Sequence, residues 1–229
     1  MSCVNYFNSR EEIGIFAETH KIMSVELGKR IFQNSKVELN INKLQWGSII
    51  PDFYPKYRLI RHYSDESLDF IVNEIVSLIY MSRYINFERG MDKLTNKYFS
   101  TKLGIISHYL SDYVCLPHFD RWTFGNSMRK HVKYEKDLAK LALDYEFKKG
   151  VINASDINVM DMGTEKVDLK KSVKEYIETV LTEYSQNKGY ESDLNYAVDL
   201  SSKIACFVIE TANCLYYIRE KSLEKVFVF

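Results

Sequence analysis

The scarcity of helix-breaking residues is the feature that most constrains the fold of this sequence. Only three prolines occur (Pro51, Pro55 and Pro117), and the nine glycines are scattered along the 229 residues. Proline interrupts a helix because it lacks a backbone N–H and clashes with the preceding turn. Several long proline-free stretches carry apolar residues at three- and four-residue spacing, which predicts long amphipathic helices.

The first three expected helices have recognisable boundaries. Ser9, followed by two acids at Glu11 and Glu12, is a capping serine that predicts a helix over residues 10–32. A third helix over residues 91–115 ends before Pro117, because the residue preceding a proline disfavours the helical conformation. Between them, Ser64 or Asp65 caps a second helix, whose inner face carries Leu68, Ile71, Ile75, Leu78 and Ile79.

The remaining chain also reads as helical. A fourth helix is expected over residues 124–149, with Gly150 as a left-handed cap. Residues 151–168 are loop-like, and residues 34–62, which lack helical rhythm, are expected to form a long ordered loop. Two further helices start near Leu169 and Leu194, the second with a core stripe of Ile204, Phe207, Val208, Thr211, Leu215 and Ile218. No repeat or linker divides the chain, so we predict one all-α domain over residues 1–229.

The composition narrows the functional classes. Lysine plus arginine and aspartate plus glutamate both number 31, so the zero net charge gives no support for a stable nucleic-acid partner. No apolar stretch is long enough to span a bilayer, and the N-terminus does not resemble a signal peptide. We therefore expect a cytoplasmic protein with free thiols at Cys3, Cys115, Cys206 and Cys214, with secretion as the alternative if a leader precedes this sequence.

The histidines are concentrated near acidic residues. Two His-x3-acid pairs occur on successive expected helices, His108 with Asp112 and His131 with Glu135, and His118 lies between them. Residues four apart share one face of a helix, so each pair can reach a single cation. Imidazole nitrogen and carboxylate oxygen are zinc ligands at roughly 2.0–2.2 Å, which makes both pairs candidate zinc ligands.

Each histidine taken singly has an ordinary structural explanation. A histidine and an acid four apart often form a solvated pair that adds only a few tenths of a kcal/mol. His108, with apolar neighbours at Ile105, Ile106 and Leu110, would also suit a hydrogen-bonded core position. His20 and His62 alone would need no functional explanation.

The order of these residues along the chain is more specific than any pair. The sequence contains His20, a Pro-Asp element with Asp52, His62, then His108-x3-Asp112-x5-His118 and His131-x3-Glu135. This pattern resembles the zinc-dependent phospholipase C family of bacteria, whose fold is shared by the S1/P1-type nucleases. The resemblance spans residues 20–135 and uses all five histidines of the chain.

The resemblance implies a cluster of three zinc ions in a cleft of a helical domain. It assigns one ion to Asp52, His62, His108 and Asp112, and a second to His118, His131 and Glu135. The third would bind His20, a bridging Asp112 and the amino nitrogen and carbonyl oxygen of the first residue, which is a tryptophan in the family. Here the only tryptophans are Trp46 and Trp122. We therefore expect two zinc ions, and a third if removal of Met1 exposes an amino group on Ser2 that can bind it.

The resemblance also implies the chemistry. A metal pair roughly 3.5–4 Å apart activates water for attack on a phosphodiester. Asp52 is implied as a ligand, as the base, or as both, and Phe53 and Tyr54 are candidates for lining a substrate pocket, unless they are ordinary core aromatics.

We therefore predict a zinc-dependent phosphodiesterase that acts on a phospholipid. The alternatives are an S1/P1-like nuclease or another phosphodiesterase, and a non-catalytic protein whose helices are held together by zinc. Structural zinc sites are closed by four protein ligands, so eight candidate ligands shared among two or three ions favour catalysis.

Overall fold

The fold is all-α, as predicted. The computed structural model describes residues 10–123, 126–157 and 168–226, and no strand occurs among them. The helices of the first half are α1 (Arg10–Ser35), α2 (Ile41–Gly47), α3 (Ile50–Phe53), α4 (Pro55–Arg58) and α5 (Ser64–Ser82). They are followed by α6 (Lys93–Tyr113), α7 (Leu116–Phe119), α8 (Asn126–Ala142), α9 (Leu169–Tyr184) and α10 (Tyr190–Val226).

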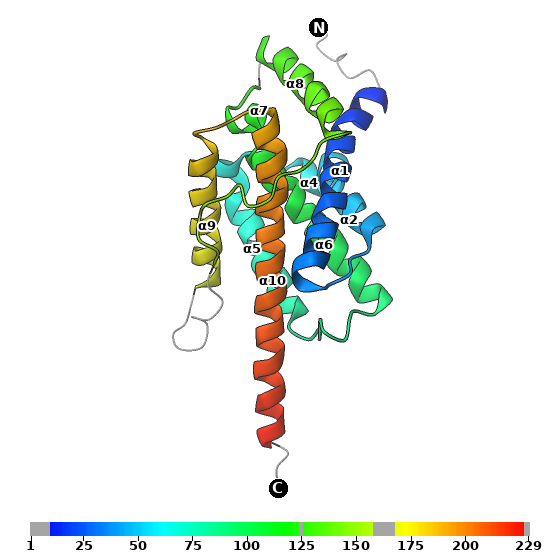
Figure 1. The fold of residues 1–229 in the computed structure, drawn as a ribbon, viewed down its shortest axis with the longest axis vertical. Helices are drawn as coiled ribbons and strands as arrows, with labels where there is room; N and C mark the ends of the chain where they lie inside the picture. Colours follow the sequence, from blue (N-terminus) through cyan, green and yellow to red (C-terminus); the bar gives the residue numbers. More distant parts are fainter. Residues whose placement is uncertain (1–9, 124–125, 158–167, 227–229) are drawn as a thin grey trace.

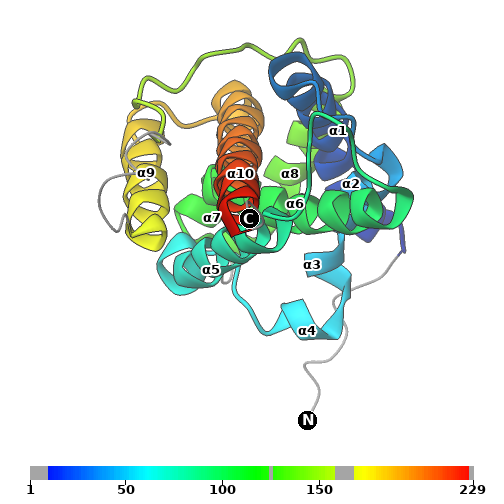
Figure 2. The same cartoon turned by 90° about the horizontal axis from the view of Figure 1, so that it is seen from below.

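The long helix α10 runs through the middle of the molecule (Figure 1). Seen from below, α9 lies on one side of it, α1 and α2 lie on the other, and α5 and α6 pack across it (Figure 2). Helices α3 and α4 stand at the edge of this arrangement. The C-terminal end of α10 projects beyond the other helices (Figure 1).

One hydrophobic core joins the described helices. The apolar face predicted for α5 is confirmed, because Leu68, Ile71, Ile75, Leu78 and Ile79 are all buried. On α10, Ile204, Phe207, Val208 and Thr211 are buried, whereas Leu215 is half-buried and Ile218 is 50% exposed. The predicted core stripe of α10 is therefore wrong at Ile218, near the C-terminal end of the helix.

The predicted loop over residues 34–62 is wrong, because it contains three short helices. Asn40 caps α2 by accepting a hydrogen bond from the Lys43 backbone N–H at 3.0 Å. Pro51 lies in the first turn of α3 and Pro55 is the first residue of α4. Proline is favourable in a first turn, since its fixed φ suits the helix and no N–H is needed there. Helices of four to seven residues are too short to show an apolar rhythm.

Several predicted boundaries also shift. Helix α8 ends at Ala142 rather than at residue 149, and the chain then crosses toward α10, where Lys148 N donates to Asn195 Oδ1 at 2.8 Å. The last helix begins at Tyr190 rather than near Leu194.

The helix starts shift for local reasons. Helix α6 begins at Lys93, capped by Asp92, and α5 begins at Ser64, but with Tyr63 in the capping position and no side-chain hydrogen bond there. The predicted serine cap at residue 9 and the predicted helix start at residue 124 lie outside the described residues.

Helices α2 and α6 touch through their backbones. A Cβ atom on Gly104 would lie 2.3 Å from the Leu44 carbonyl oxygen and 2.8 Å from Gly47 Cα. Both distances are shorter than any van der Waals contact, so only glycine fits at position 104. This close approach brings Ser48, the C-cap residue that follows α2, against α6.

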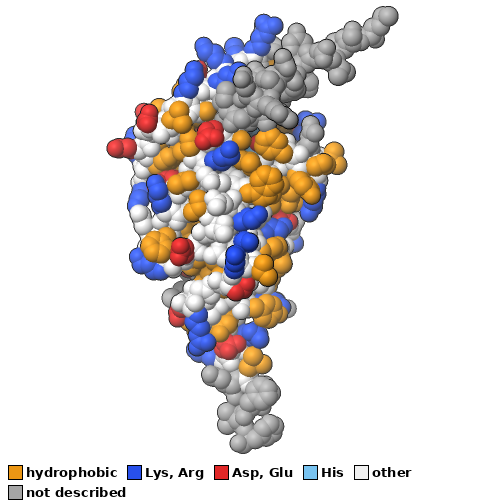
Figure 3. Space-filling model, turned by 90° about the vertical axis from the view of Figure 1, so that its right-hand side faces the viewer, with side chains coloured by type: hydrophobic (Ala, Val, Ile, Leu, Met, Phe, Trp, Pro, Cys, Tyr) orange, Lys and Arg blue, Asp and Glu red, His pale blue; other side chains and the backbone are white. Residues whose placement is uncertain are grey.

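The surface is mixed in character. On the face drawn in Figure 3, basic and acidic side chains are interspersed with apolar ones. In the part of the chain that the structure describes, no helix combines the length and apolarity needed to cross a membrane.

Candidate metal centre

Helix α6 presents His108 and Asp112 one turn apart. The His108 side chain is 1% exposed, and its Nε2 lies 3.2 Å from Asp112 Oδ2. Its Nδ1 lies 2.8 Å from the Ser48 carbonyl oxygen, which can only accept, so Nδ1–H is the donor. This hydrogen bond orients the ring so that Nε2 faces Asp112, and Nε2 can bind a metal ion once it gives up its proton.

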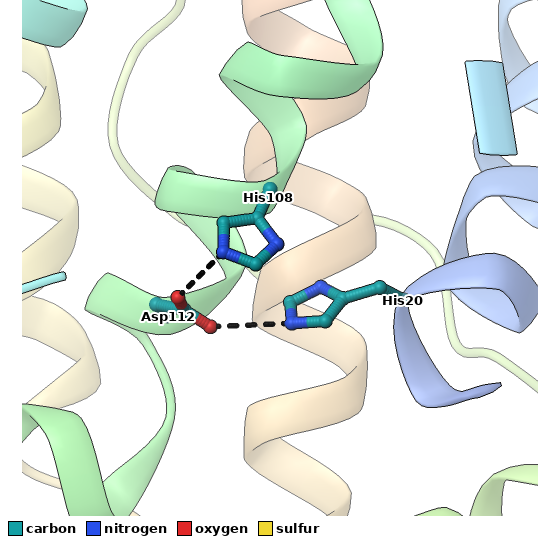
Figure 4. Close-up of side chains that lie close together, drawn as sticks. All are labelled: His20, His108 and Asp112. Carbon is teal, nitrogen blue, oxygen red and sulfur yellow. Dashed lines mark ion pairs between the residues drawn. The ribbon is translucent and has the colours of Figure 1, made fainter. Parts of the chain in front are cut away.

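Asp112 lies between three histidines. Its Oδ1 is 3.4 Å from His20 Nε2, and its Oδ2 is 2.8 Å from His62 Nδ1 (Figure 4 shows His20, His108 and Asp112). Burial by itself would raise the pKa of the Asp112 carboxyl. The charges of His108 and His118 and the hydrogen bonds from His108 and His20 outweigh burial and hold that pKa well below its usual range. Asp112 is therefore a carboxylate with one oxygen toward His20 and the other toward His62 and His108, the arrangement of a bridging ligand.

Asp52 and His62 complete this side of the site. Asp52 lies on α3 and His62 in the turn between α4 and α5. Asp52 Oδ1 is 3.8 Å from His62 Nδ1 and 3.6 Å from His108 Nε2. At 32% exposure, the Asp52 side chain is more accessible to solvent than any of the residues it faces. It therefore stands at the open edge of the site.

A second group joins α7 to α8. His118 Nε2 is 3.2 Å from Glu135 Oε1, and His131 Nε2 is 2.9 Å from the same oxygen. His131 Nδ1–H donates to the Trp122 carbonyl oxygen at 3.1 Å, which orients this ring as Ser48 orients that of His108.

In the second group, the neighbouring histidines and carboxylates stabilise one another's charged forms. Burial raises the pKa of Glu135, but hydrogen bonds from His118 and His131 outweigh it and lower that pKa to about 2. Burial lowers the pKa of His118, but the charge of Asp112 and the hydrogen bond to Glu135 raise it to about 9. Without a metal ion, Glu135 is therefore a charged carboxylate at neutral pH, and His118 is a protonated imidazolium.

The two sides form one continuous site. Ring centroids follow one another along a row of imidazoles: His20–His108 4.2 Å, His108–His62 4.8 Å, His62–His118 6.2 Å and His118–His131 4.8 Å. A small cavity of about 40 Å³ lies beside the row and is lined by His20, Asp112 and Glu135 among others.

The donor set fits zinc. Three groups bring one ligand atom per residue to within 4.8 Å of one another: His20–His108–Asp112, Asp52–His62–His108 and His118–His131–Glu135. Two atoms that each bind a tetrahedral zinc at about 2.1 Å lie about 3.4 Å apart, close to the separations above. The first two groups share His108, and none of the three contains the four protein ligands that close a structural site, which leaves a coordination position for water or substrate.

The structure thus brings together the eight residues that the sequence pattern singled out, while their role as ligands stays a prediction. The amino group implied for a third ion lies outside the described residues. Phe53 and Tyr54 are 43% and 57% exposed, so their interpretation as core aromatics is wrong. The roles of the Ser48 and Trp122 carbonyls are not visible in the sequence, because any residue in those positions supplies the same backbone oxygen.

The fold and the site together define a class: an all-α protein in which histidine and carboxylate side chains from several helices form one candidate metal centre. Comparison with protein families extends this result, since the model of the family described as zinc dependent phospholipase C matches residues 16–191. The chain belongs to this family, and the match includes every candidate ligand. No curated protein and no solved structure gave a match.

Proposed function

We propose that this protein is a zinc-dependent phosphodiester hydrolase that acts on a phospholipid. The observation that carries the proposal is the row of three adjacent groups, two of which share His108, none with the four protein ligands that close a structural zinc site. Membership of the zinc-dependent phospholipase C family supports the same class of substrate.

The residues of the site have distinct roles in the proposed reaction. Ser48 and Trp122 orient two imidazoles through their carbonyl oxygens, so that Nε2 of His108 and of His131 is directed at the site. Asp112 and Glu135 supply negative charge to balance cations there. Bound zinc would activate water as a nucleophile at neutral pH and offset the charge of a phosphodiester. We propose that the eight residues hold two zinc ions, and a third with the terminal amino group.

We propose that Asp52 acts as the general base that accepts a proton from the attacking water. Its carboxylate is at the open edge of the site, within 4 Å of two imidazole nitrogens, where it can accept a proton and release it to solvent. Phe53 and Tyr54 follow it directly in the chain and are exposed, so we propose that they contact the substrate's head group.

Metal analysis combined with two substrates tests the proposal. We expect the purified protein to contain at least two zinc ions per chain. We also expect hydrolysis of bis-p-nitrophenyl phosphate and of phosphatidylcholine, abolished by a chelator and restored by zinc. His131→Ala should lower the zinc content by about one ion per chain and turnover by more than tenfold, because it removes one of the three candidate ligands of the second group. Lys133→Ala, an exposed change on the same helix, serves as the control and should alter neither.

Two results would contradict this function. Stoichiometric zinc without turnover of either phosphodiester would favour a protein that uses zinc only to hold its helices together. Unchanged zinc content in His108→Ala, with the fold intact, would refute the ligand assignment itself.

A further inference from the structure

A buried carboxylate outside the candidate ligands lies directly behind the second metal group. Asp193, in the first turn of α10, is 3% exposed. Its Oδ1 accepts hydrogen bonds from the Tyr184 hydroxyl at 2.5 Å and from Gly189 N–H at 3.3 Å. Its Oδ2 accepts from the Tyr134 hydroxyl at 2.8 Å and from Leu116 N–H at 3.0 Å. One side chain thus receives four donors.

The donors come from the elements that carry the second group. Leu116 is the first residue of α7, two residues before His118. Tyr134 lies on α8 immediately before Glu135 and three residues after His131. The carboxylate of Asp193 therefore ties α7 and α8 to each other as well as to the start of α10. Its hydrogen bond from the Tyr184 hydroxyl also ties the end of α9 to these three helices.

The orientation of His118 depends on these bonds to Asp193 more than that of His108 or His131 does. Among the described residues, its Nδ1 is buried and has no hydrogen-bond partner, whereas Nδ1 of His108 and of His131 each donates to a backbone carbonyl. No hydrogen bond therefore sets the far side of the His118 ring, and its direction follows from the backbone of α7. That helix has only four residues, and the bond from Leu116 N–H to Asp193 holds its first one.

We propose that Asp193 is a positioning residue for the second metal group: it fixes α7 against α8 so that His118, His131 and Glu135 converge on one ion. This inference rests on the proposed function, since it presumes that the group binds zinc. Partners behind the ligands of a metal site commonly affect metal affinity by 10–100-fold.

The substitution Asp193→Asn isolates this role. Asparagine has the same shape but only one acceptor oxygen, so in either orientation of its amide one backbone N–H, that of Leu116 or that of Gly189, loses its acceptor. Asp199→Asn is the matched control, because Asp199 is a second buried acid of α10, 6% exposed, that accepts from Ile152 N–H and Arg30 instead. Both substitutions disturb a buried hydrogen-bonded carboxylate, but only Asp193 is bonded to the elements of the second group.

Zinc affinity and the visible spectrum of the cobalt-substituted protein are the readouts. We expect Asp193→Asn to weaken one class of zinc sites by 10–100-fold and to change the cobalt absorption bands, with the other class unaffected. Asp199→Asn should lower thermal stability while zinc affinity and cobalt spectrum remain those of the wild type. A folded Asp193→Asn protein that binds every zinc ion with wild-type affinity would overturn the inference.

A milder variant covers the case in which Asp193→Asn does not fold. Tyr134→Phe removes only the bond between α8 and Asp193, and it should weaken the same class of sites several-fold; unchanged affinity would overturn the inference. His131→Ala separates this outcome from a failure of the proposed function. If that variant keeps the full zinc content, the second group does not bind zinc, and both proposals are wrong.

Discussion

The protonation of single residues governs how the metal-free site responds to pH. Glu135 has its pKa lowered to about 2, so its contribution to stability is present above the usual carboxyl range and is lost as pH falls toward that value. His118 has its pKa raised to about 9 from 6.5, so its contribution is complete below 6.5 and is lost as pH rises through 9. Both contributions are complete together only in mildly acidic solution.

We therefore expect the chelator-treated protein to reach its highest melting temperature in mildly acidic solution. Glu135→Gln removes the carboxylate, so it should flatten the acidic side of the curve of melting temperature against pH. Glu178→Gln, an exposed change on α9, is the control and should leave the curve unaltered. An acidic side that keeps its slope in Glu135→Gln would show that the charge of Glu135 does not stabilise the fold.

The identity of the candidate ligands could be predicted at this scale, but their orientation could not. The four-residue spacing of His108 and Asp112 is a local property of a helix, so it is visible in the sequence. The roles of Ser48 and Asp193 depend on contacts between segments far apart in the chain, which a single sequence does not show.

At the scale of elements, the contact between α2 and α6 positions the candidate ligand His108. Gly104 lies one turn before His108 on α6, and the α2 backbone next to it carries the Ser48 carbonyl that orients His108. Gly104→Ala must push α2 away, because its Cβ would meet backbone atoms. We expect it to lower the free energy of unfolding by about 1–3 kcal/mol and to reduce zinc affinity. Chemical denaturation and zinc titration measure the two effects.

Gly28→Ala provides a matched control within α1. The atom nearest to its new Cβ is the flexible end of the Ile41 side chain, which can move aside. Both variants gain about 1 kcal/mol of helix propensity, so the difference between them isolates the backbone clash. If Gly104→Ala proved as stable as Gly28→Ala and bound zinc normally, the contact would not matter to the site.

The long helices were predictable at this scale because each repeats an apolar pattern over several turns. The short helices α2, α3 and α4 were not, and the end of α8 was placed too late. In both cases the helix boundaries depend on tertiary contacts, such as the hydrogen bond from the Lys148 N–H to Asn195 that holds the chain after α8 against α10.

For the molecule as a whole, metal binding and folding should be coupled. The candidate ligands come from α1, α3, α6, α7, α8 and the turn before α5, so bound zinc would join segments that are separate in the unfolded chain. A free zinc concentration one hundred times the Kd adds about 2.7 kcal/mol of stability per ion. We therefore expect a chelator to lower the melting temperature in scanning calorimetry, and by a smaller amount in His131→Ala. Equal melting temperatures with and without chelator would contradict zinc binding to the folded state.

The row of imidazoles has a practical consequence for spectroscopy. All five histidines of the chain lie in it, so the rest of the protein contributes no histidine signal. An isotope label on imidazole nitrogen would give a nuclear magnetic resonance spectrum of the site alone, without background from elsewhere in the molecule. Each ring could then be followed separately as it exchanges a proton for a metal ion.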